Sequence, residues 1–148
     1  MKVPQSTQYA EEHLEKANQN LFAAKLMNDN KFFDWTITCS YYAMYHATMA
    51  SLWLIGLDAR SHECAIVAFE IFYVKEHKVD KEYVGYVNKA KTLSKKYSES
   101  LEYAKTERIK ASYGLGEITS QEASKVLSDA REFVATIGQL VLEANGLG

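Results

Sequence analysis

The sequence predicts an all-α protein, an antiparallel up-and-down bundle of four long helices with one shorter helix inserted. Apolar residues recur at spacings of three and four in four long segments, and no stretch alternates apolar and polar residues as a half-buried strand does. The single proline leaves long helices uninterrupted. A chain of 148 residues can bury a core of its own, so we expect one domain over residues 1–148 with its core at about residues 8–144.

The first expected helix follows a polar lead and carries a seam of small residues. Ser6 or Thr7 can cap it, and Glu11 and Glu12 lie in its opening turns, where the helix dipole favours acidic side chains. A repeat of four and three residues predicts a packing seam made of Ala10, Leu14, Ala17, Leu21 and Ala24. The turn at residues 28–30 ends this helix.

The segment from Trp35 to Leu57 is apolar and aromatic nearly all round, which is typical of a helix at the centre of a bundle. Asp34 is a candidate N-cap, and Gly56 is placed to end the helix. The apolar run falls short of the roughly 20 residues that a membrane span needs, and polar side chains interrupt it. We therefore expect a buried helix of a soluble protein and no membrane partner.

Three more helices are expected after this central one. Ser61 is a candidate N-cap for a short, well-packed third helix, and Glu82 opens a fourth, which Ser98 divides into two pieces in one interpretation. Thr119 and Glu122 form a capping box at the start of the last helix, whose pattern is the most amphipathic of the chain.

Charge and cysteine content restrict the class of protein. A net charge of −2 argues against a protein that grips long nucleic acids through its overall field. Basic residues gather locally at Lys89, Lys91, Lys95 and Lys96, either as a basic face or as an ordinary solvated helix surface. Cys39 and Cys64 lie in apolar helical patterns, so we expect reduced, buried thiols in a cytoplasmic protein; no secretory signal is evident.

Four side chains of the central helix could carry chemistry. Tyr41 with Tyr45, and Tyr42 with His46, are four residues apart, which places two aromatic pairs on adjacent faces. Such rings can stack on bases and bond phosphates, and His46 can exchange a proton near neutral pH. The same residues also serve as hydrogen-bonded core material in many proteins, and both interpretations stay open.

Arg108 is the second candidate, because it lies in the apolar register of the fourth helix, seven residues after Leu101. A guanidinium inside a bundle is paired or aimed at a phosphate, since an unpaired buried charge is costly. Tyr113 follows five residues later. A structural salt bridge or a hydrogen bond to a tyrosine is the alternative role for Arg108.

Metal and cofactor chemistry has little support in the sequence. HExxH, paired ExxH carboxylates and a glycine-rich phosphate loop are all missing, so we expect no metal and no cofactor. The adjacent His62, Glu63 and Cys64 diverge around a helix and make a weak metal site. His13 and His77 lie among polar residues and are expected to face solvent.

Four segments, in this order, resemble the HEPN superfamily of small prokaryotic helical proteins: SYYAMYHA (residues 40–47), SHECAIVAF (61–69), ERIKASYG (107–114) and the TSQEASKVLSDAREFV helix. The first and third are similar to the YYAMFHA-like and RxxADY-like motifs of an archaeal and bacterial branch of that superfamily. The resemblance covers roughly residues 8–144. It implies the helical bundle already predicted, commonly as a homodimer.

The resemblance implies two roles. Many HEPN proteins are helical partners of a minimal nucleotidyltransferase, with a nucleotide- or RNA-binding role in a toxin–antitoxin-like module. Carried onto this chain, that role assigns phosphate or nucleotide binding to Arg108, Tyr113, Tyr42 and His46.

Other HEPN proteins are metal-independent ribonucleases, often toxins, that use an Arg followed four to six residues later by a His. Arg108 matches that Arg, but Tyr113 stands at the His position and no histidine follows. A tyrosine, with an ordinary pKa of about 10, is a poor base at neutral pH. We therefore expect a weakly catalytic or non-catalytic protein, with His46 as a substitute only if it lies beside Arg108. A structural adaptor without nucleotide binding is the third interpretation.

Overall fold

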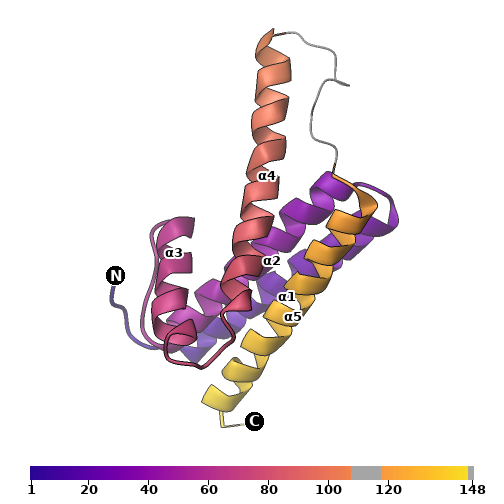
Figure 1. Cartoon of the computed structure of the whole chain (residues 1–148). Helices are drawn as coiled ribbons and strands as arrows, with labels where there is room; N and C mark the ends of the chain where they lie inside the picture. Colours follow the sequence, from indigo (N-terminus) through magenta and orange to yellow (C-terminus); the bar gives the residue numbers. More distant parts are fainter. Residues whose placement is uncertain (108–117, 147–148) are drawn as a thin grey trace.

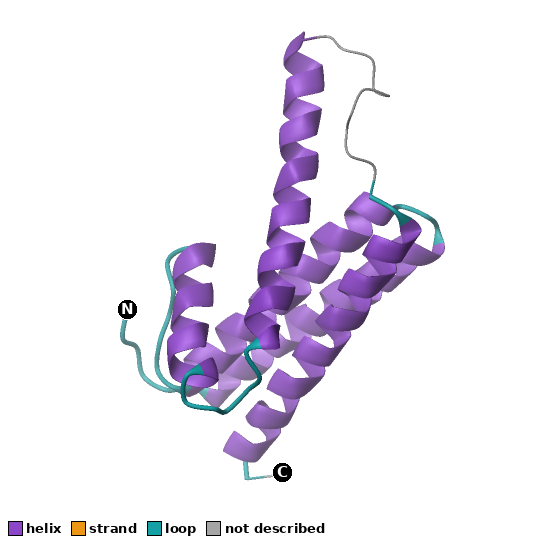
Figure 2. Ribbon diagram, in the orientation of Figure 1, coloured by secondary structure: helices purple, strands orange, loops and turns teal. Residues whose placement is uncertain are grey.

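The computed structural model describes residues 1–107 and 118–146, with side chains described outside residues 95–117 (Figure 1). Its long helices are α1 (Thr7–Asp29), α2 (Phe33–Leu54), α4 (Glu82–Glu107) and α5 (Ser120–Ala144). The shorter α3 (His62–Phe69) continues into a π-helical turn, η1 (Glu70–Val74). Within the described ranges every named element is helical, which confirms the all-α prediction (Figure 2).

Helix α2 is the centre of the fold. It contacts α1, α3, α4 and α5, and its buried side chains cover most of its circumference. Two of its buried hydroxyls bond within the helix: Thr48 donates to the Met44 carbonyl at 2.9 Å, and Ser51 donates to the Thr48 carbonyl at 2.6 Å. These bonds let polar residues occupy the middle of the core without a large desolvation cost.

Helix α1 packs on α2 through small residues, as its seam predicts. Ala10, Ala17 and Ala24 are fully buried, which allows the two helix backbones to approach closely. The Ser6 hydroxyl caps α1 by accepting a hydrogen bond from the Tyr9 amide at 3.0 Å. Only residues 30–32 connect α1 to α2, so these helices are antiparallel neighbours (Figure 1).

Helix α5 closes the bundle against α1 and α2. The predicted capping box is present, because the Thr119 hydroxyl accepts from the Glu122 amide while the Glu122 carboxylate accepts from the Thr119 amide. Phe133 of α5 meets Phe69 of α3 with ring centroids 5.3 Å apart. This contact joins the shorter helix to the same core.

Three local predictions were wrong. Asp34 lies in the first turn of α2, and the N-cap position is Phe32, which makes no side-chain cap. Ser98 does not divide the fourth helix, since α4 runs unbroken from Glu82 to Glu107. A single serine lowers helix stability by only about a few tenths of a kcal/mol, which neighbouring residues of higher helix propensity can offset. Cys64 is exposed, and Cys39 is half-buried.

The third helix also packs less completely than expected. Val67, Ile71 and Phe72 are 57, 42 and 42 % exposed, although Phe69 and Tyr73 of the same segment are buried. The segment is apolar on both sides, but its contacts with α2 and α4 cover only one of them. None of the helices searched in the described part of the chain is long and apolar enough to cross a membrane.

Candidate functional site

Six aromatic and imidazole side chains gather along one side of α2, where α1 and α3 meet it. Four come from α2 and one each from α1 and α3; they are Tyr41, Tyr42, Tyr45, His46, His13 and His62. We call this group the aromatic–imidazole cluster. Within α2, residues one, three and four apart bring the tyrosines and His46 onto neighbouring faces.

His62 is held by three tyrosines of α2. Its ring stacks on Tyr45 with centroids 3.9 Å apart and an interplanar angle of 22°. Tyr42 meets it edge-on at 6.0 Å and 89°, and the Tyr41 hydroxyl is hydrogen-bonded to its Nδ1. The position of His62 is set by the N-cap of α3, because the Ser61 hydroxyl accepts from the Cys64 amide at 3.1 Å and starts the helix at His62.

His13 and His46 form a second pair in the cluster. Their Nδ1 atoms are 3.1 Å apart, so one imidazole donates and the other accepts. The expectation that His13 faces solvent was wrong: it is half-buried, because it stands one residue before Leu14, at the edge of the α1 seam. The signal available in the sequence was its spacing from Ala10 and Ala17, three and four residues away.

The environment of His46 keeps its imidazole neutral. Burial, followed by the neighbouring His13, Lys16 and His62, lowers the pKa of His46 from 6.5 to about 4. Burial lowers the pKa of His13 as well. At neutral pH both rings are therefore uncharged and are available as hydrogen-bond partners rather than as cations.

Two tyrosines of the cluster, Tyr41 and Tyr45, keep their protons. Burial raises the pKa of Tyr41 to about 12, with smaller contributions from Tyr42 and Tyr45. Burial also raises the pKa of Tyr45, and Asp58 adds to that shift. The ring of Tyr42 is 42 % exposed, so a ligand can reach it from solvent.

Cationic side chains border the cluster. The ammonium of Lys91 in α4 lies 3.6 Å from a carboxylate oxygen of Glu63. Burial lowers the pKa of His62, and the charge of Lys91 lowers it further. Lys89 is exposed. The side chains of Lys95 and Lys96 lie outside the described residues. Rings beside a cation suit a ligand that joins an aromatic base to a phosphate.

Two of the four predicted binding residues, Tyr42 and His46, lie in the cluster. Arg108 and Tyr113 lie outside the described residues, and so does any contact between His46 and Arg108. His13 and His62 were not among the predicted site residues. His13 and His62 contact side chains of a different helix, α2. The spacing of residues within a single segment therefore cannot predict these contacts.

Metal ligands do not assemble in the part of the chain that the structure describes. No group of three or more His, Cys, Asp or Glu side chains there could hold a metal ion. His13 and His46 form only a pair, and His62 is engaged with tyrosines. The described cluster therefore suits stacking and hydrogen bonding better than metal chemistry.

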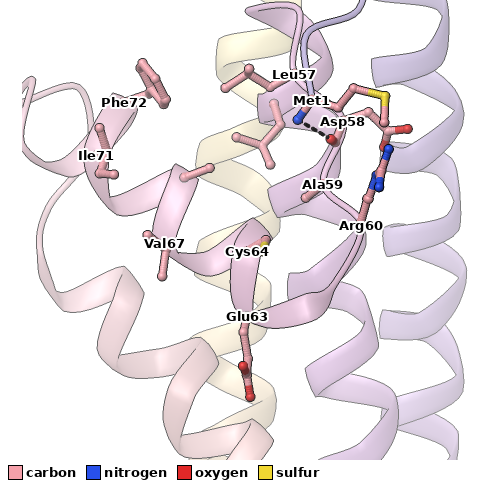
Figure 3. Close-up of a pocket in the computed structure, with 12 residues that line it drawn as sticks. Met1, Leu57, Asp58, Ala59, Arg60, Glu63, Cys64, Val67, Ile71 and Phe72 are labelled. Atoms are coloured by element: carbon pink, nitrogen blue, oxygen red, sulfur yellow. Dashed lines mark hydrogen bonds between the residues drawn. The ribbon is translucent and has the colours of Figure 1, made fainter.

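A cavity of about 600 Å³ lies beside α3 (Figure 3), and none of its lining residues belongs to the aromatic–imidazole cluster. Its lining is mostly apolar, with Leu57, Val67, Ile71 and Phe72 among the residues, and Arg60 stands at its edge. The Met1 ammonium donates to the Asp58 carbonyl at 3.1 Å and ties the chain start to this rim. The exposed Cys64 also lines the cavity.

Comparison with known proteins gives a family and several relatives. A family profile described as HEPN domain matches residues 10–140. A relative from Methanocaldococcus jannaschii that carries a provisional toxin name is 28 % identical over 130 residues, which is 88 % of this chain and 87 % of that protein. A UPF0332 protein from Pyrococcus horikoshii is 29 % identical over 92 residues, 62 % of this chain and 63 % of the relative. A second protein of M. jannaschii with a provisional toxin name is 26 % identical over 100 residues, 68 % of this chain and 65 % of its own length.

Proposed function

This chain belongs to the HEPN family, and from that premise we propose that it binds a nucleotide or an RNA phosphate at the aromatic–imidazole cluster. In this proposal it is the helical partner subunit of a minimal nucleotidyltransferase, in a toxin–antitoxin-like module, and acts as a homodimer. Arg108 and Tyr113 complete the phosphate site, with Tyr42 and His46 lining it.

One observation carries the binding proposal: an exposed tyrosine ring, a fixed imidazole and a lysine stand together. Tyr42 meets His62 edge-on at 6.0 Å, and Lys91 is near enough to His62 to lower its pKa. Stacking of a base on an aromatic ring contributes about 1–3 kcal/mol, whatever the base. A neighbouring cation then favours ligands that carry a phosphate.

A weakly catalytic role is supported by the state of His46. A general base works best when its pKa lies near the operating pH, and burial holds the pKa of His46 at about 4. A neutral imidazole with so low a pKa accepts a proton poorly in a transition state. His46 is therefore suited to binding a ligand, and it is a poor substitute for the histidine that is missing after Arg108.

A thermal-shift series with ATP, GTP and a short single-stranded RNA tests this proposal. A ligand that binds only the folded state raises the melting temperature. We expect a shift with at least one of these ligands in the wild type and its loss in Arg108→Ala. Arg131→Ala, which removes an exposed arginine of α5, is the matched control and keeps the shift. A wild type that no ligand shifts contradicts the proposal and favours the structural adaptor.

The alternative is a metal-independent ribonuclease toxin, which the provisional toxin names of two relatives favour. In that case expression of the chain arrests growth, and Arg108→Ala abolishes the arrest while the protein still accumulates. Growth unaffected by expression of the folded wild type counts against a ribonuclease and leaves the partner role.

A further inference from the structure

We propose that His62 donates the hydrogen bond that holds the ligand's phosphate, through its Nε2–H, and that Tyr41 is the positioning residue that fixes this tautomer. This inference rests on the proposed function and names the donor of the same site. The ligand class is a phosphate joined to a base, as in a mononucleotide or in single-stranded RNA.

The tautomer follows from the hydroxyl of Tyr41. Tyr41 is only 5 % exposed, and burial raises its pKa to about 12, so the O–H stays intact. Among the hydrogen bonds of the described residues, the bond to His62 Nδ1 is the one that this hydroxyl makes. A buried O–H group that finds no acceptor costs about 1–3 kcal/mol. A hydroxyl oxygen that accepts no hydrogen bond costs less.

The hydroxyl of Tyr41 therefore donates, and Nδ1 of His62 accepts. A neutral imidazole carries one ring hydrogen, so an accepting Nδ1 places that hydrogen on Nε2. His62 then presents an N–H donor at the end of its side chain, while the inner nitrogen is engaged.

The ring of His62 is also held in place before any ligand arrives. Tyr45 covers one ring face at 3.9 Å, and Tyr42 stands at its edge at 6.0 Å. With the Tyr41 bond, contacts on three sides restrict both rotation and tilt of the imidazole. A donor that is already oriented gives up less side-chain entropy on binding, which leaves more of the hydrogen-bond energy for affinity.

Charge near His62 favours an anion. Lys91 faces it from α4, and Glu63, the partner of Lys91 at 3.6 Å, has a side chain that is 84 % exposed. A long pair with one partner in solvent is weak, so a phosphate can replace Glu63 beside Lys91. The start of α3 at His62 adds the positive end of a helix dipole.

The base has a surface next to this phosphate position. Tyr42 is 42 % exposed and adjoins His62, whereas Tyr41 is buried. A phosphate bound at His62 thus places an attached base within reach of the Tyr42 ring. Nucleotides should accordingly bind more tightly than inorganic phosphate.

The tautomer can be measured on the free protein by nitrogen-15 NMR of the imidazoles. We expect His62 of the wild type to carry its hydrogen on Nε2, and Tyr41→Phe to give a mixture of the two tautomers. A wild type with the hydrogen on Nδ1 overturns the positioning role of Tyr41.

Two substitutions of His62 then test the donor. His62→Gln keeps an N–H at about the depth of Nε2, whereas His62→Asn places its polar atoms only at the depth of Nδ1. We expect titration calorimetry with AMP to give an affinity about tenfold lower for His62→Asn, the equivalent of about 1.4 kcal/mol, and a smaller loss for His62→Gln. His77→Asn, at an exposed position outside the cluster, is the control and binds as the wild type does.

The outcomes separate this inference from the proposed function. If the wild type binds AMP or a short RNA and folded His62→Asn binds equally well, His62 is not the donor, although the proposed function stands. If the wild type binds neither ligand, both fail. Parallel titrations with inorganic phosphate, AMP and RNA show whether the site selects the base as well as the phosphate.

Discussion

The half-buried imidazole pair of His13 and His46 predicts that the free energy of unfolding falls in acid. Between the ordinary pKa of 6.5 and the folded value of about 4, the unfolded chain binds more protons at His46 than the folded chain does. Stability from this group is therefore complete above pH 6.5 and is lost as the pH falls toward 4. The loss is on the order of 1 kcal/mol, because partial exposure reduces the full shift.

His46→Gln should flatten this dependence. Urea unfolding at pH 7 and at pH 4.5 measures it, and the expected change is a smaller difference between the two free energies of unfolding than in the wild type. The exposed His77→Asn variant is the control and retains the wild-type difference. An identical difference in His46→Gln would show that the pKa of His46 is not lowered in the folded protein.

At the same scale, the sequence predicts some residues of the aromatic–imidazole cluster and misses others for a physical reason. Tyr42 and His46 stand four residues apart on one helix, so the period of that helix brings them together. His13 and His62 come from α1 and α3, and only the packing of those helices on α2 brings them to the cluster. Local spacing carries no information on such contacts.

Single elements are the part of the fold that the sequence determines best. The caps at Ser6, Ser61 and Thr119 were predicted from residue type and are present, because each cap depends on neighbours three residues away. The partial exposure of α3 and η1 was not predicted, since it depends on which other elements cover the segment. Asp34 has the right chemistry for a cap, but the N-cap position of α2 lies two residues earlier, at Phe32.

The seam of α1 gives a prediction at the scale of the element. Ala17 is fully buried between closely packed helices, so Ala17→Leu should lower the free energy of unfolding by about 1–3 kcal/mol through overpacking. Gln19→Leu places the same leucine side chain at an exposed position of α1 and is the control. Chemical denaturation compares the two. Equal stability of both variants would mean that the α1–α2 contact is looser than the buried alanines indicate.

At the scale of the molecule, the proposed homodimer makes a direct prediction. Sedimentation velocity at micromolar concentration should give twice the chain mass of 16.8 kDa. The ribbon of helix α4 extends beyond the other described helices in Figure 1. A mass of 16.8 kDa at every concentration up to the millimolar range would exclude the dimer.

The four histidines supply a built-in test of the proposed binding of a nucleotide or an RNA phosphate at the aromatic–imidazole cluster. Three of them lie in the cluster, and His77 is exposed outside it. We would titrate the wild type with ATP, GTP and a short single-stranded RNA, and follow the imidazole resonances by NMR. We expect saturable shifts of the resonances of His62 and of the His13 and His46 pair, with those of His77 unchanged. Saturable binding that leaves all three cluster histidines unmoved would contradict the proposal, and so would the absence of binding by all three ligands.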